Sequence, residues 1–316
     1  MTVPLDVDTL AAALAERLGP GSLAQVEKRV PMSSRTTFRV GGPADVFVSP
    51  SSVDDIAAAL RFCRENGVPS TLLGNGSNVV VADRGIRGVV VALGDGFARI
   101  GPGASRDGMR EVHAEAGARL SALAAYCTRQ GLSGLEALSG IPGTVGGAVL
   151  MNAGAYDRCM QDVVVLTEYL DEDGAACVAE GEAHGFGYRR SAFLGGGRVV
   201  TRTTVRLAAA DPRAVQDAVN DFGRRRRESQ PLELPSAGSV FRRPPGRYVG
   251  RLVEECGLKG AKEGGAQVSP KHAGFIVNAG GATAEDVRRL MERVRDAVSE
   301  RTGVRLEPEI LFIGEW

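Results

Sequence analysis

The sequence predicts an α+β fold of more than one domain, in which short strands alternate with amphipathic helices. Runs of β-branched and aliphatic residues at 71–73, 79–81 and 89–91 are separated by glycines, a pattern typical of short strands. Apolar residues at helical spacing follow Ser52 and Thr283, and both residue types are common helix N-caps. A chain of 316 residues commonly forms two domains.

The first 93 residues are expected to form an α/β lobe. Residues 2–19 are predicted to be an amphipathic helix, and residues 37–48, which contain two adjacent glycines, a strand pair with a tight turn. A helix capped by Ser52 is predicted to end at Asn66, and short strands follow it.

A second α+β lobe is expected over residues 94–209. It contains short strands, one predicted helix over 120–130 and a glycine-dense centre over 131–154. Asp211 followed by Pro212 then predicts the start of a new helix, because proline is favoured at the first helical position. We therefore place a domain boundary near this point.

The last domain is expected over residues 210–303. A helix is predicted around 248–256, and strands are predicted near Gln267 and Phe275.

A long helix near the end of the chain is marked at both ends. Thr283 and Asp286 form a predicted capping box, and Gly303 closes the helical pattern. A final strand is predicted over 304–313.

The charge balance argues against a general attraction to nucleic acid or to anionic membranes. The chain has 38 basic and 38 acidic residues, so its formal net charge is zero. No apolar run approaches the roughly 18 residues of a membrane span, and the N-terminus lacks the features of a signal peptide. We therefore expect a cytoplasmic protein with no nucleic-acid partner and no membrane partner.

The cysteines argue against a disulfide framework and against a zinc site. There are five, far apart in the sequence, and none forms a Cys-x-x-Cys pair. We expect no metal site.

A first glycine motif is a candidate anion cradle. It comprises Gly74, Asn75, Gly76, Ser77 and Asn78. Small residues allow backbone N–H groups to turn toward an anion such as a pyrophosphate. The motif is not a Rossmann fingerprint, because a third glycine and an immediate helix are missing. The alternative is a glycine-rich hairpin turn.

A second glycine motif is a candidate surface for a flat cofactor. Its members are Gly140, Ile141, Pro142, Gly143, Thr144, Gly146 and Gly147, followed by Asn152, Ala153 and Gly154. Several glycines and a proline in so short a stretch predict a fixed loop with few bulky side chains. The alternative is a close-packed interface between lobes.

Five segments together resemble one enzyme family. They are 73–78, 140–147, 187–191, 236–241 and 306–309, and in this order they are similar to the UDP-N-acetylenolpyruvoylglucosamine reductases. The absence of an inserted tyrosine-bearing loop after Phe193 resembles the shorter branch of that family.

The resemblance implies a fold and a reaction. It implies a two-lobed FAD-binding domain of the vanillyl-alcohol-oxidase (PCMH) type, followed by a C-terminal α/β substrate-binding domain. Residues 304–316 would return toward the active site. NADPH would reduce FAD, and the enolpyruvyl ether of UDP-N-acetylglucosamine would then be reduced to UDP-N-acetylmuramate for peptidoglycan. Family members are commonly monomeric, so a monomer is expected.

The resemblance also implies three catalytic residues. Arg189 would stabilise the enolate, Ser239 would protonate the carbon, and Glu309 would position or relay the proton. Arg190 competes with Arg189, although neighbours on an extended chain point in opposite directions. Glu307 would share a strand face with Glu309 and competes with it.

Further residues stand where the family contacts its nucleotide-sugar substrate. These candidates are Arg243, Lys271 and His272, since a diphosphate favours fixed cations. Ser229 stands where a basic residue is often found, which puts one contact in doubt. The flavin is expected to be bound non-covalently, because none of the three histidines lies inside a glycine motif.

Two other functions remain open from the sequence. One is an FAD-dependent alcohol or sugar oxidase of the same superfamily. The other is a non-catalytic protein that binds nucleotide sugars. Without the resemblance, an arginine such as Arg189 is read as a surface ion pair, and a serine such as Ser239 as a turn residue.

Overall fold

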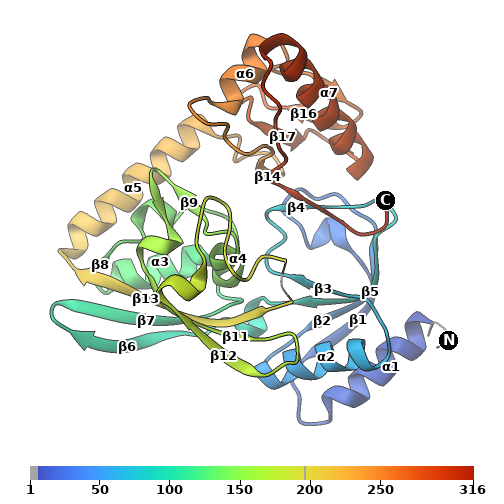
Figure 1. Ribbon diagram of the computed structural model, residues 1–316, viewed down its shortest axis with the longest axis vertical. Coiled ribbons are helices and arrows are strands. Elements are labelled where there is room, and N and C mark those ends of the chain that lie inside the picture. The colour runs from blue at the N-terminus through green and yellow to red at the C-terminus, as the bar shows by residue number, and fades with distance from the viewer. Residues whose placement is uncertain (1–5, 196) are drawn as a thin grey trace. The chain divides into compact units, whose positions relative to one another are not determined.

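The computed structural model describes residues 6–195 and 197–316 (Figure 1). These residues divide into two compact units. Unit 1 contains the residues up to 28, 46–75 and 88–225, and unit 2 contains 29–45, 76–87 and 226–316. Because the chain passes between the units several times, neither unit is one continuous stretch of sequence. The lobe and domain boundaries expected near residues 93, 209 and 303 stay predictions.

The α-helices of the described residues confirm the predicted helical segments, except that Val145–Leu150 is a helix where the second glycine motif was expected to form a loop. They are α1 (Val7–Leu18), α2 (Val53–Glu65), α3 (Leu120–Arg129), α4 (Val145–Leu150), α5 (Pro212–Ser229), α6 (Val249–Glu255) and α7 (Ala284–Thr302). The expected helix start at residue 2 lies outside the described residues. Among the helices of the described residues, none combines the length and the apolar character needed to cross a membrane.

The strands are short, as the sequence predicts. In unit 1 or across its ends they are β1 (Gln25–Pro31), β2 (Pro43–Ser49), β3 (Ser70–Leu73), β5 (Ile86–Ala92), β6 (Ile100–Arg106), β7 (Met109–Glu115), β8 (Leu132–Ser133), β9 (Gly154–Ala155), β10 (Arg158–Cys159), β11 (Val164–Leu170), β12 (Ala176–Glu180) and β13 (Val199–Ala209). In unit 2 they are β4 (Val79–Val81), β14 (Ser236–Ser239), β15 (Lys262–Glu263), β16 (Ala266–Val268), β17 (Phe275–Asn278) and β18 (Leu311–Ile313). Helices and sheets occur together in both units, which confirms the α+β class.

Unit 1 contains two sheets that share one hydrophobic core. The first has the order β1-β2-β5-β3, and the second has the order β12-β11-β13-β7-β6 with β8 paired to β13. Helices α1 and α2 pack against the first sheet, and α3 and α4 lie beside the second (Figure 1). Leu14, Ile56, Leu123 and Val149 from these helices are fully buried in this core.

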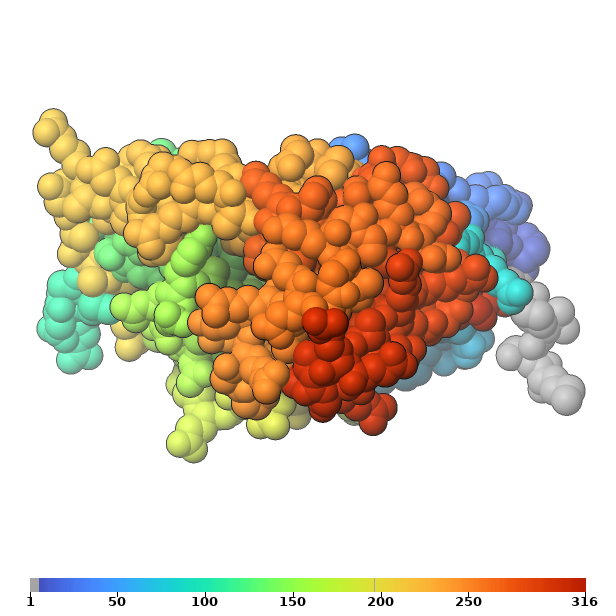
Figure 2. Space-filling model, turned by 90° about the horizontal axis from the view of Figure 1, so that it is seen from above, coloured from blue at the N-terminus to red at the C-terminus, as the bar shows by residue number. Residues whose placement is uncertain are grey.

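Unit 2 contains a small antiparallel sheet covered by two helices. The strand order is β14-β17-β16-β15, and a separate parallel pair joins β18 to β4. Leu252 of α6 and Leu290 of α7 are buried in one cluster with Val268 and Phe241. In the space-filling view, the residues coloured orange to red at the end of the chain form one compact body (Figure 2).

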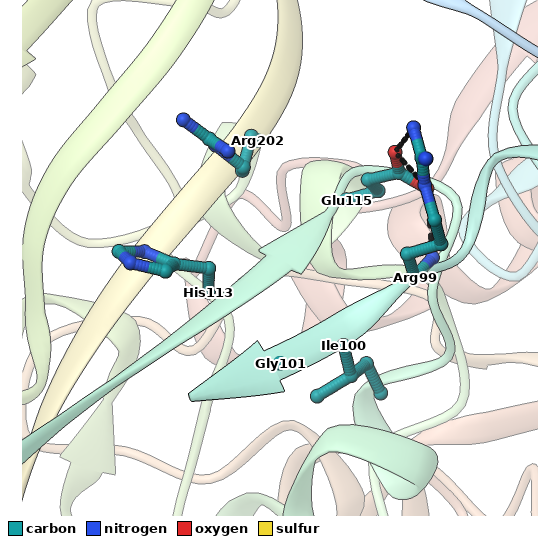
Figure 3. A pocket seen from close by; sticks show the side chains of 6 residues that line it. All are labelled: Arg99, Ile100, Gly101, His113, Glu115 and Arg202. Atoms are coloured by element: carbon teal, nitrogen blue, oxygen red, sulfur yellow. Dashed lines mark hydrogen bonds and ion pairs between the residues drawn. The ribbon is translucent and has the colours of Figure 1, made fainter. Parts of the chain in front are cut away.

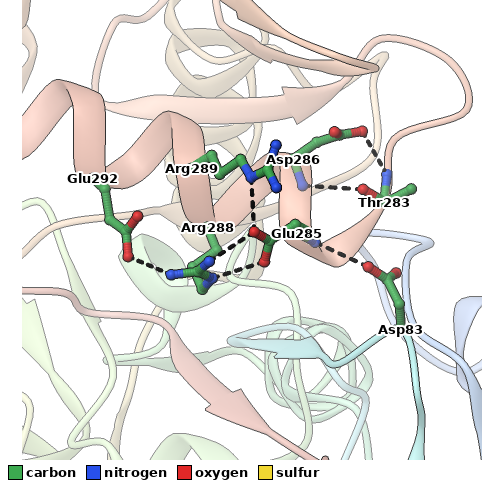
Figure 4. Close-up of polar contacts among 7 residues, drawn as sticks. All are labelled: Asp83, Thr283, Glu285, Asp286, Arg288, Arg289 and Glu292. Carbon is green, nitrogen blue, oxygen red and sulfur yellow. Dashed lines mark hydrogen bonds and ion pairs between the residues drawn. The ribbon is translucent and has the colours of Figure 1, made fainter. Parts of the chain in front are cut away.

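The start of α7 is capped twice (Figure 4). Thr283 and Asp286 form the predicted capping box, in which each side chain accepts a hydrogen bond from the backbone N–H of the other residue. Asp83 adds a second cap, because its two carboxylate oxygens accept the N–H groups of Ala284 at 2.8 Å and Glu285 at 3.1 Å. No local pattern in the sequence predicts this contact, because its residues are about 200 positions apart.

The side chain of Glu285 points along α7 toward the arginines of the next turn. Arg288 and Arg289 donate to its carboxylate and hold its pKa at about 2, below its ordinary value (Figure 4). These side chains satisfy one another along the exposed part of the first two turns.

Two predicted strands are wrong, and each has a backbone reason. Residues 37–42 form no strand, because Arg39 and Gly41 have φ values of 57° and 115°. The alternation that predicted a strand arises because Phe38 and Val40 both lie in the core of unit 2.

The final strand is also shorter than predicted. Only Leu311–Ile313 forms a strand, rather than residues 304–313. Pro308 has no N–H to donate to a ladder and makes one isolated bridge, to Phe241. Glu309 therefore precedes the strand, and the predicted strand alternation does not orient it.

We expect Asp83→Ala to destabilise unit 2 by about 1–2 kcal/mol, because two N–H groups at the start of α7 lose their acceptor. The free energy of unfolding in urea measures this loss. Asp54→Ala is the matched control, since Asp54 is an exposed acidic residue in the first turn of α2. It should cost no more than about 0.5 kcal/mol, and equal losses in the two variants would show that Asp83 acts only through its charge.

Candidate active site

The two glycine motifs meet in unit 1. Gly74 follows β3, and Thr144 is the N-cap of α4. A Cβ atom added to Gly74 would lie 2.5 Å from Oγ1 of Thr144. This hydroxyl oxygen also accepts the N–H of Gly147 at 3.4 Å. The absence of a side chain at Gly74 therefore lets one motif lie directly on the other.

The glycines of the second motif have different surroundings. A Cβ atom added to Gly146 would lie 2.8 Å from Cβ of Ala116, so this glycine serves packing within the protein. A Cβ atom added to Gly147 would meet only Thr144, at 3.5 Å, and Gly147 is exposed. The close-packed alternative therefore describes Gly146, while Gly140 and Gly147 leave backbone open to a ligand.

The end of the first motif belongs to unit 2. Gly76 has a φ of 60°, and a Cβ atom there would lie 2.6 Å from the carbonyl oxygen of Arg35. The strands on either side of the motif belong to different sheets, because β3 pairs with β5 and β4 pairs with β18. The alternative reading as a hairpin turn is therefore wrong.

Asn78, the last residue of this motif, contacts the segment of Glu309. Its amide Nδ2 donates to the carbonyl oxygen of Glu309 at 3.2 Å, and its own carbonyl accepts the N–H of Leu311 at 2.9 Å. From the sequence, Asn78 is predicted only to bind the cofactor. Its side chain holds the backbone of a candidate catalytic residue.

Arg189 lies in a two-residue turn of unit 1. The backbone groups of Gly187 and Arg190 pair in both directions, at 3.0 and 3.2 Å. Arg189 has a φ of 53°, a value that ordinary residues rarely adopt outside turns. The chain is therefore not extended here, so the expectation that Arg189 and Arg190 point in opposite directions by strand alternation is wrong.

The two adjacent arginines, Arg189 and Arg190, differ in how far they are buried. Arg189 is half-buried, with its guanidinium 5.2 Å from the centre of the Tyr188 ring, whereas Arg190 is exposed. A partly buried guanidinium is the better candidate for charge stabilisation, because the surrounding dielectric is lower.

Side chains on both sides of the turn connect it to the end of α4. Nδ2 of Asn152 donates to the carbonyl oxygen of Gly187 at 3.0 Å. The hydroxyl of Ser191 donates to the carbonyl oxygen of Leu150 at 2.8 Å. The Gly187–Ser191 segment is thus fixed to the residues that follow the second glycine motif.

Ser239 lies at an irregularity of the small sheet in unit 2. Ser236 pairs with Val277 and Ser239 with Phe275, so β14 carries one extra residue between the two pairs. Gly238 has a φ of 79° within this bulge. Bulges commonly redirect a side chain at an active site, and here Ser239 is half-buried with its hydroxyl 3.2 Å from the carbonyl oxygen of Phe241.

The segment of Glu309 runs beside the segment of Ser239. The N–H of Glu309 donates to the carbonyl oxygen of Val240 at 2.9 Å, and the N–H of Arg242 donates to the carbonyl oxygen of Glu307 at 2.8 Å. Unit 2 therefore brings Ser239 and Glu309 onto neighbouring backbones. Glu309 is half-buried and Glu307 is exposed, which favours Glu309 of the two carboxylates.

The three candidate substrate residues also lie in unit 2. Nζ of Lys271 donates to the carbonyl oxygen of Arg227 at 2.5 Å and lies 3.8 Å from the carboxylate of Glu233. The guanidinium of Arg243 stacks on the Tyr248 ring, 4.0 Å from its centre. Both cations are exposed.

His272 differs from these two cations. Burial lowers the pKa of its imidazole, and Nδ1 accepts the N–H of Gly274 at 3.1 Å. The ring is therefore neutral at pH 7 with its proton on Nε2, so it can donate a hydrogen bond but does not supply the cation that the sequence analysis expected.

Buried polar atoms of unit 2 include some on residues that were not predicted to form the site. Within the described residues, Oε1 of Gln230 and Nε of Arg242 have no hydrogen-bond partner. Buried polar groups are usually paired, so these two atoms are available to a polar ligand or to water. Gln230 directly follows Ser229, which is exposed.

A surface pocket of about 330 Å³ lies elsewhere in unit 1 (Figure 3). It is lined by Arg99, Ile100, Gly101, His113, Glu115 and Arg202, none of which the sequence analysis selected. Arg99 pairs with Glu115, Arg202 pairs with Glu168, and Nδ1 of His113 lies 2.8 Å from the hydroxyl of Thr204. Its charged groups are therefore satisfied by cross-strand neighbours, and the pocket is not the candidate active site.

Comparison with known families matches both parts of the chain. A model described as FAD binding domain matches residues 44–180, and a model described as UDP-N-acetylenolpyruvoylglucosamine reductase, C-terminal domain, matches residues 230–313. These matches agree with the expected FAD-binding region followed by a separate C-terminal domain.

Individual relatives are similar over almost the whole chain. The UDP-N-acetylenolpyruvoylglucosamine reductase of Moorella thermoacetica is 45% identical over 96% of this chain and 98% of its own length. The corresponding protein of Caldanaerobacter subterraneus is 42% identical over 98% of this chain and 99% of its own length. The crystal structure of the reductase from Thermus caldophilus superposes with a TM-score of 0.75 at 36% identity, covering 92% of this chain and 100% of that one. The chain therefore belongs to the UDP-N-acetylenolpyruvoylglucosamine reductase family.

Proposed function

We propose that the protein is an FAD-containing, NADPH-dependent oxidoreductase that converts UDP-N-acetylglucosamine-enolpyruvate to UDP-N-acetylmuramate in peptidoglycan synthesis. The observation that carries this proposal is the identity of 45% to a reductase over 96% of the chain. The match of residues 230–313 to the reductase's C-terminal domain favours this activity over that of an alcohol or sugar oxidase. The presence of Arg, Ser and Glu at the three expected positions favours turnover over simple binding.

The glycine motifs fit a flat cofactor. Gly74 and Thr144 bring the two motifs into contact, and Gly147 and Gly140 leave backbone uncovered. We assign both motifs, Ala153 and Gly154 to FAD binding. When bound, FAD supplies the hydride, received from NADPH, that is added to the β-carbon of the enolpyruvyl group.

The protein's own residues then manage the charge that this addition creates. The electron pair of the double bond moves to the α-carbon and is delocalised onto the carboxylate. Arg189 provides a fixed cation for that carboxylate, and stabilising charge that develops in the transition state is typically the largest catalytic term. The left-handed turn and its contacts to α4 hold the guanidinium in place before the substrate reacts.

Ser239 supplies the proton. Its O–H bond breaks as a C–H bond forms at the α-carbon, which leaves a lactyl ether and a serine alkoxide. A serine hydroxyl is a weak acid, so it serves as a donor only to a strongly basic carbon held close to it. Glu309, whose backbone is bonded to that of Val240, relays a proton taken up from solvent to the alkoxide, which restores the serine hydroxyl and leaves the carboxylate.

The substrate's diphosphate and sugar are assigned to unit 2. Arg243 and Lys271 supply charge, and neutral His272 donates a hydrogen bond from Nε2. The unpaired atoms of Gln230 and Arg242 would find partners on the same ligand. Because NADPH and nucleotide sugars are cytoplasmic metabolites, we place the reaction in the cytoplasm and keep the prediction of a monomer.

We expect Ser239→Ala to separate the two half-reactions. NADPH should still reduce the flavin, while reoxidation of the flavin by UDP-N-acetylglucosamine-enolpyruvate should slow by about 10²–10⁴-fold, the usual contribution of a general acid. Anaerobic stopped-flow absorbance follows both steps in one sample, so flavin reduction is the internal control. Unchanged reoxidation would remove Ser239 from the mechanism.

We expect Gly74→Ala to weaken FAD binding, because the new methyl group would collide with Thr144. Such overpacking typically costs about 1–3 kcal/mol of folding stability, and displacement of the first motif should also raise the dissociation constant of FAD in fluorescence titration. A second change, Thr144→Ala, removes the colliding hydroxyl and should restore part of the affinity.

Gly21→Ala is the matched control for this collision, since Gly21 is exposed and a Cβ atom there meets nothing within 4 Å. The control should bind FAD normally. Normal binding by Gly74→Ala itself would show that the contact between the two motifs does not shape the cofactor site.

We expect His272 to make the protein less stable at acid pH. Its folded pKa lies below the ordinary value of 6.5, so its contribution to stability is complete above pH 6.5 and declines as the pH falls through the lowered pKa. Urea unfolding at pH 7.5 and at lower pH compares the wild type with His272→Gln. The stability lost on acidification should be smaller in the variant, and an equal loss would contradict the assignment of a buried neutral ring.

A further inference from the structure

We infer that Asn152 is a positioning residue, which holds the turn of Arg189 to the end of α4 rather than binding the cofactor through its side chain. The inference rests on the proposed function, because it concerns the placement of the proposed enolate-stabilising arginine.

The backbone of Asn152 ends helix α4. Its φ of 42° lies in the left-handed region. The N–H of Asn152 donates to the carbonyl oxygen of Val149, and the N–H of Ala153 donates to that of Ala148. These two bonds form a Schellman motif, in which the left-handed position is normally glycine and sometimes asparagine. Glycine would adopt this backbone at lower cost, so the backbone alone does not explain an asparagine here.

The side chain of Asn152 is fully used within the protein. Its exposed fraction is 5%, Nδ2 donates to the carbonyl oxygen of Gly187 at 3.0 Å, and Oδ1 accepts the N–H of Gln161 at 3.0 Å. The amide also contacts the thiol of Cys159, whose pKa it lowers against the larger effect of burial. A buried amide with both ends paired has little capacity left for a cofactor.

The bond to Gly187 acts where the turn needs support. Arg189 has a φ of 53°, and a left-handed residue other than glycine persists only where its surroundings hold it. Asn152 binds the residue two positions before Arg189, and Ser191 binds Leu150 from the residue two positions after it. Arg189 is therefore fixed from both sides to residues 150–152, which directly follow the second glycine motif.

The test compares three variants in the holoenzyme. Asn152→Gly keeps the left-handed backbone and the Schellman motif but removes both side-chain bonds. Asn152→Asp keeps the shape and the acceptor for Gln161, but it replaces the donor to Gly187 with a carboxylate oxygen. Asn66→Gly is the matched control, because Asn66 also ends a helix and its Nδ2 donates to the carbonyl oxygen of Phe62 at 2.9 Å.

Three quantities are measured for each variant. The ratio of flavin to protein absorbance reports bound FAD, and thermal unfolding reports stability. The flavin is then reduced photochemically without NADPH, and its anaerobic reoxidation by UDP-N-acetylglucosamine-enolpyruvate reports the step that Arg189 serves.

We expect both Asn152 variants to retain FAD and to reoxidise about 10–100-fold more slowly, the effect of moving a catalytic group by about 1 Å. The Asn66 variant should reoxidise at the wild-type rate. Arg189→Ala supplies a double-mutant cycle, since adding Asn152→Gly to it should cause little further slowing if Asn152 acts through Arg189.

Three results would overturn the inference. Loss of FAD from Asn152→Gly, with normal reoxidation of the fraction that remains, would make Asn152 a cofactor ligand. Equal slowing by Asn152→Gly with and without Arg189 would mean that it acts elsewhere, and a lower unfolding temperature with unchanged reoxidation would mean a purely structural role. Failure of the wild-type flavin to be reoxidised by this substrate would instead contradict the proposed function.

Discussion

The contact between Gly74 and Thr144 is the constraint on which unit 1 depends. With a side chain at position 74, a Cβ atom would lie 2.5 Å from the threonine hydroxyl, and the first motif would have to move away from the second. The same threonine starts α4 by accepting the N–H of Gly147. Because α4 has only six residues, its start and its end are close together. A displacement at Thr144 would therefore also reach Asn152 and the turn that carries Arg189.

Each glycine motif is followed or ended by an asparagine whose side-chain amide donates to a backbone carbonyl of another segment. Asn78 closes the first motif and donates to the carbonyl oxygen of Glu309, and Asn152 closes the second region and donates to the carbonyl oxygen of Gly187. An amide can bind a backbone carbonyl while its oxygen remains available as an acceptor, which suits it to joining two loops. Each asparagine thereby connects a segment assigned to the cofactor with a segment assigned to catalysis. Contacts between loops, as well as pairing within sheets, therefore fix the segments of Arg189 and Glu309 before the substrate binds.

Local chemistry explains which parts of the fold could be predicted. Ser52, Thr283 and Gly303 act within a few residues of their own position, and the helices that they begin or end are confirmed. The strand predicted over 37–42 is absent. Phe38 and Val40 are both buried and so give the alternating pattern of a strand, but the sequence does not reveal the positive φ of Arg39 between them. Asp83 escapes prediction for a different reason, since its partners are about 200 residues away. The glycine motifs could be identified because each is a short continuous stretch of sequence. The contacts of Asn78 and Asn152 could not, because they join segments that only the tertiary fold brings together.

The choice between paired candidates shows what the structure adds to the motifs. The sequence presents two adjacent arginines and two glutamates separated by one proline, and residue type cannot distinguish the members of either pair. A turn at Tyr188 and Arg189 replaces the extended chain, and the first arginine becomes half-buried while the second is exposed. Pro308 cannot join a ladder, so Glu309 is held by the N–H that it donates to Val240 and by Asn78, while Glu307 stays exposed. In both pairs the favoured residue is the half-buried one, and its competitor is exposed. A charge held in place before the substrate binds requires little reorganisation when charge develops in the reaction, and this is the physical reason for preferring Arg189 and Glu309.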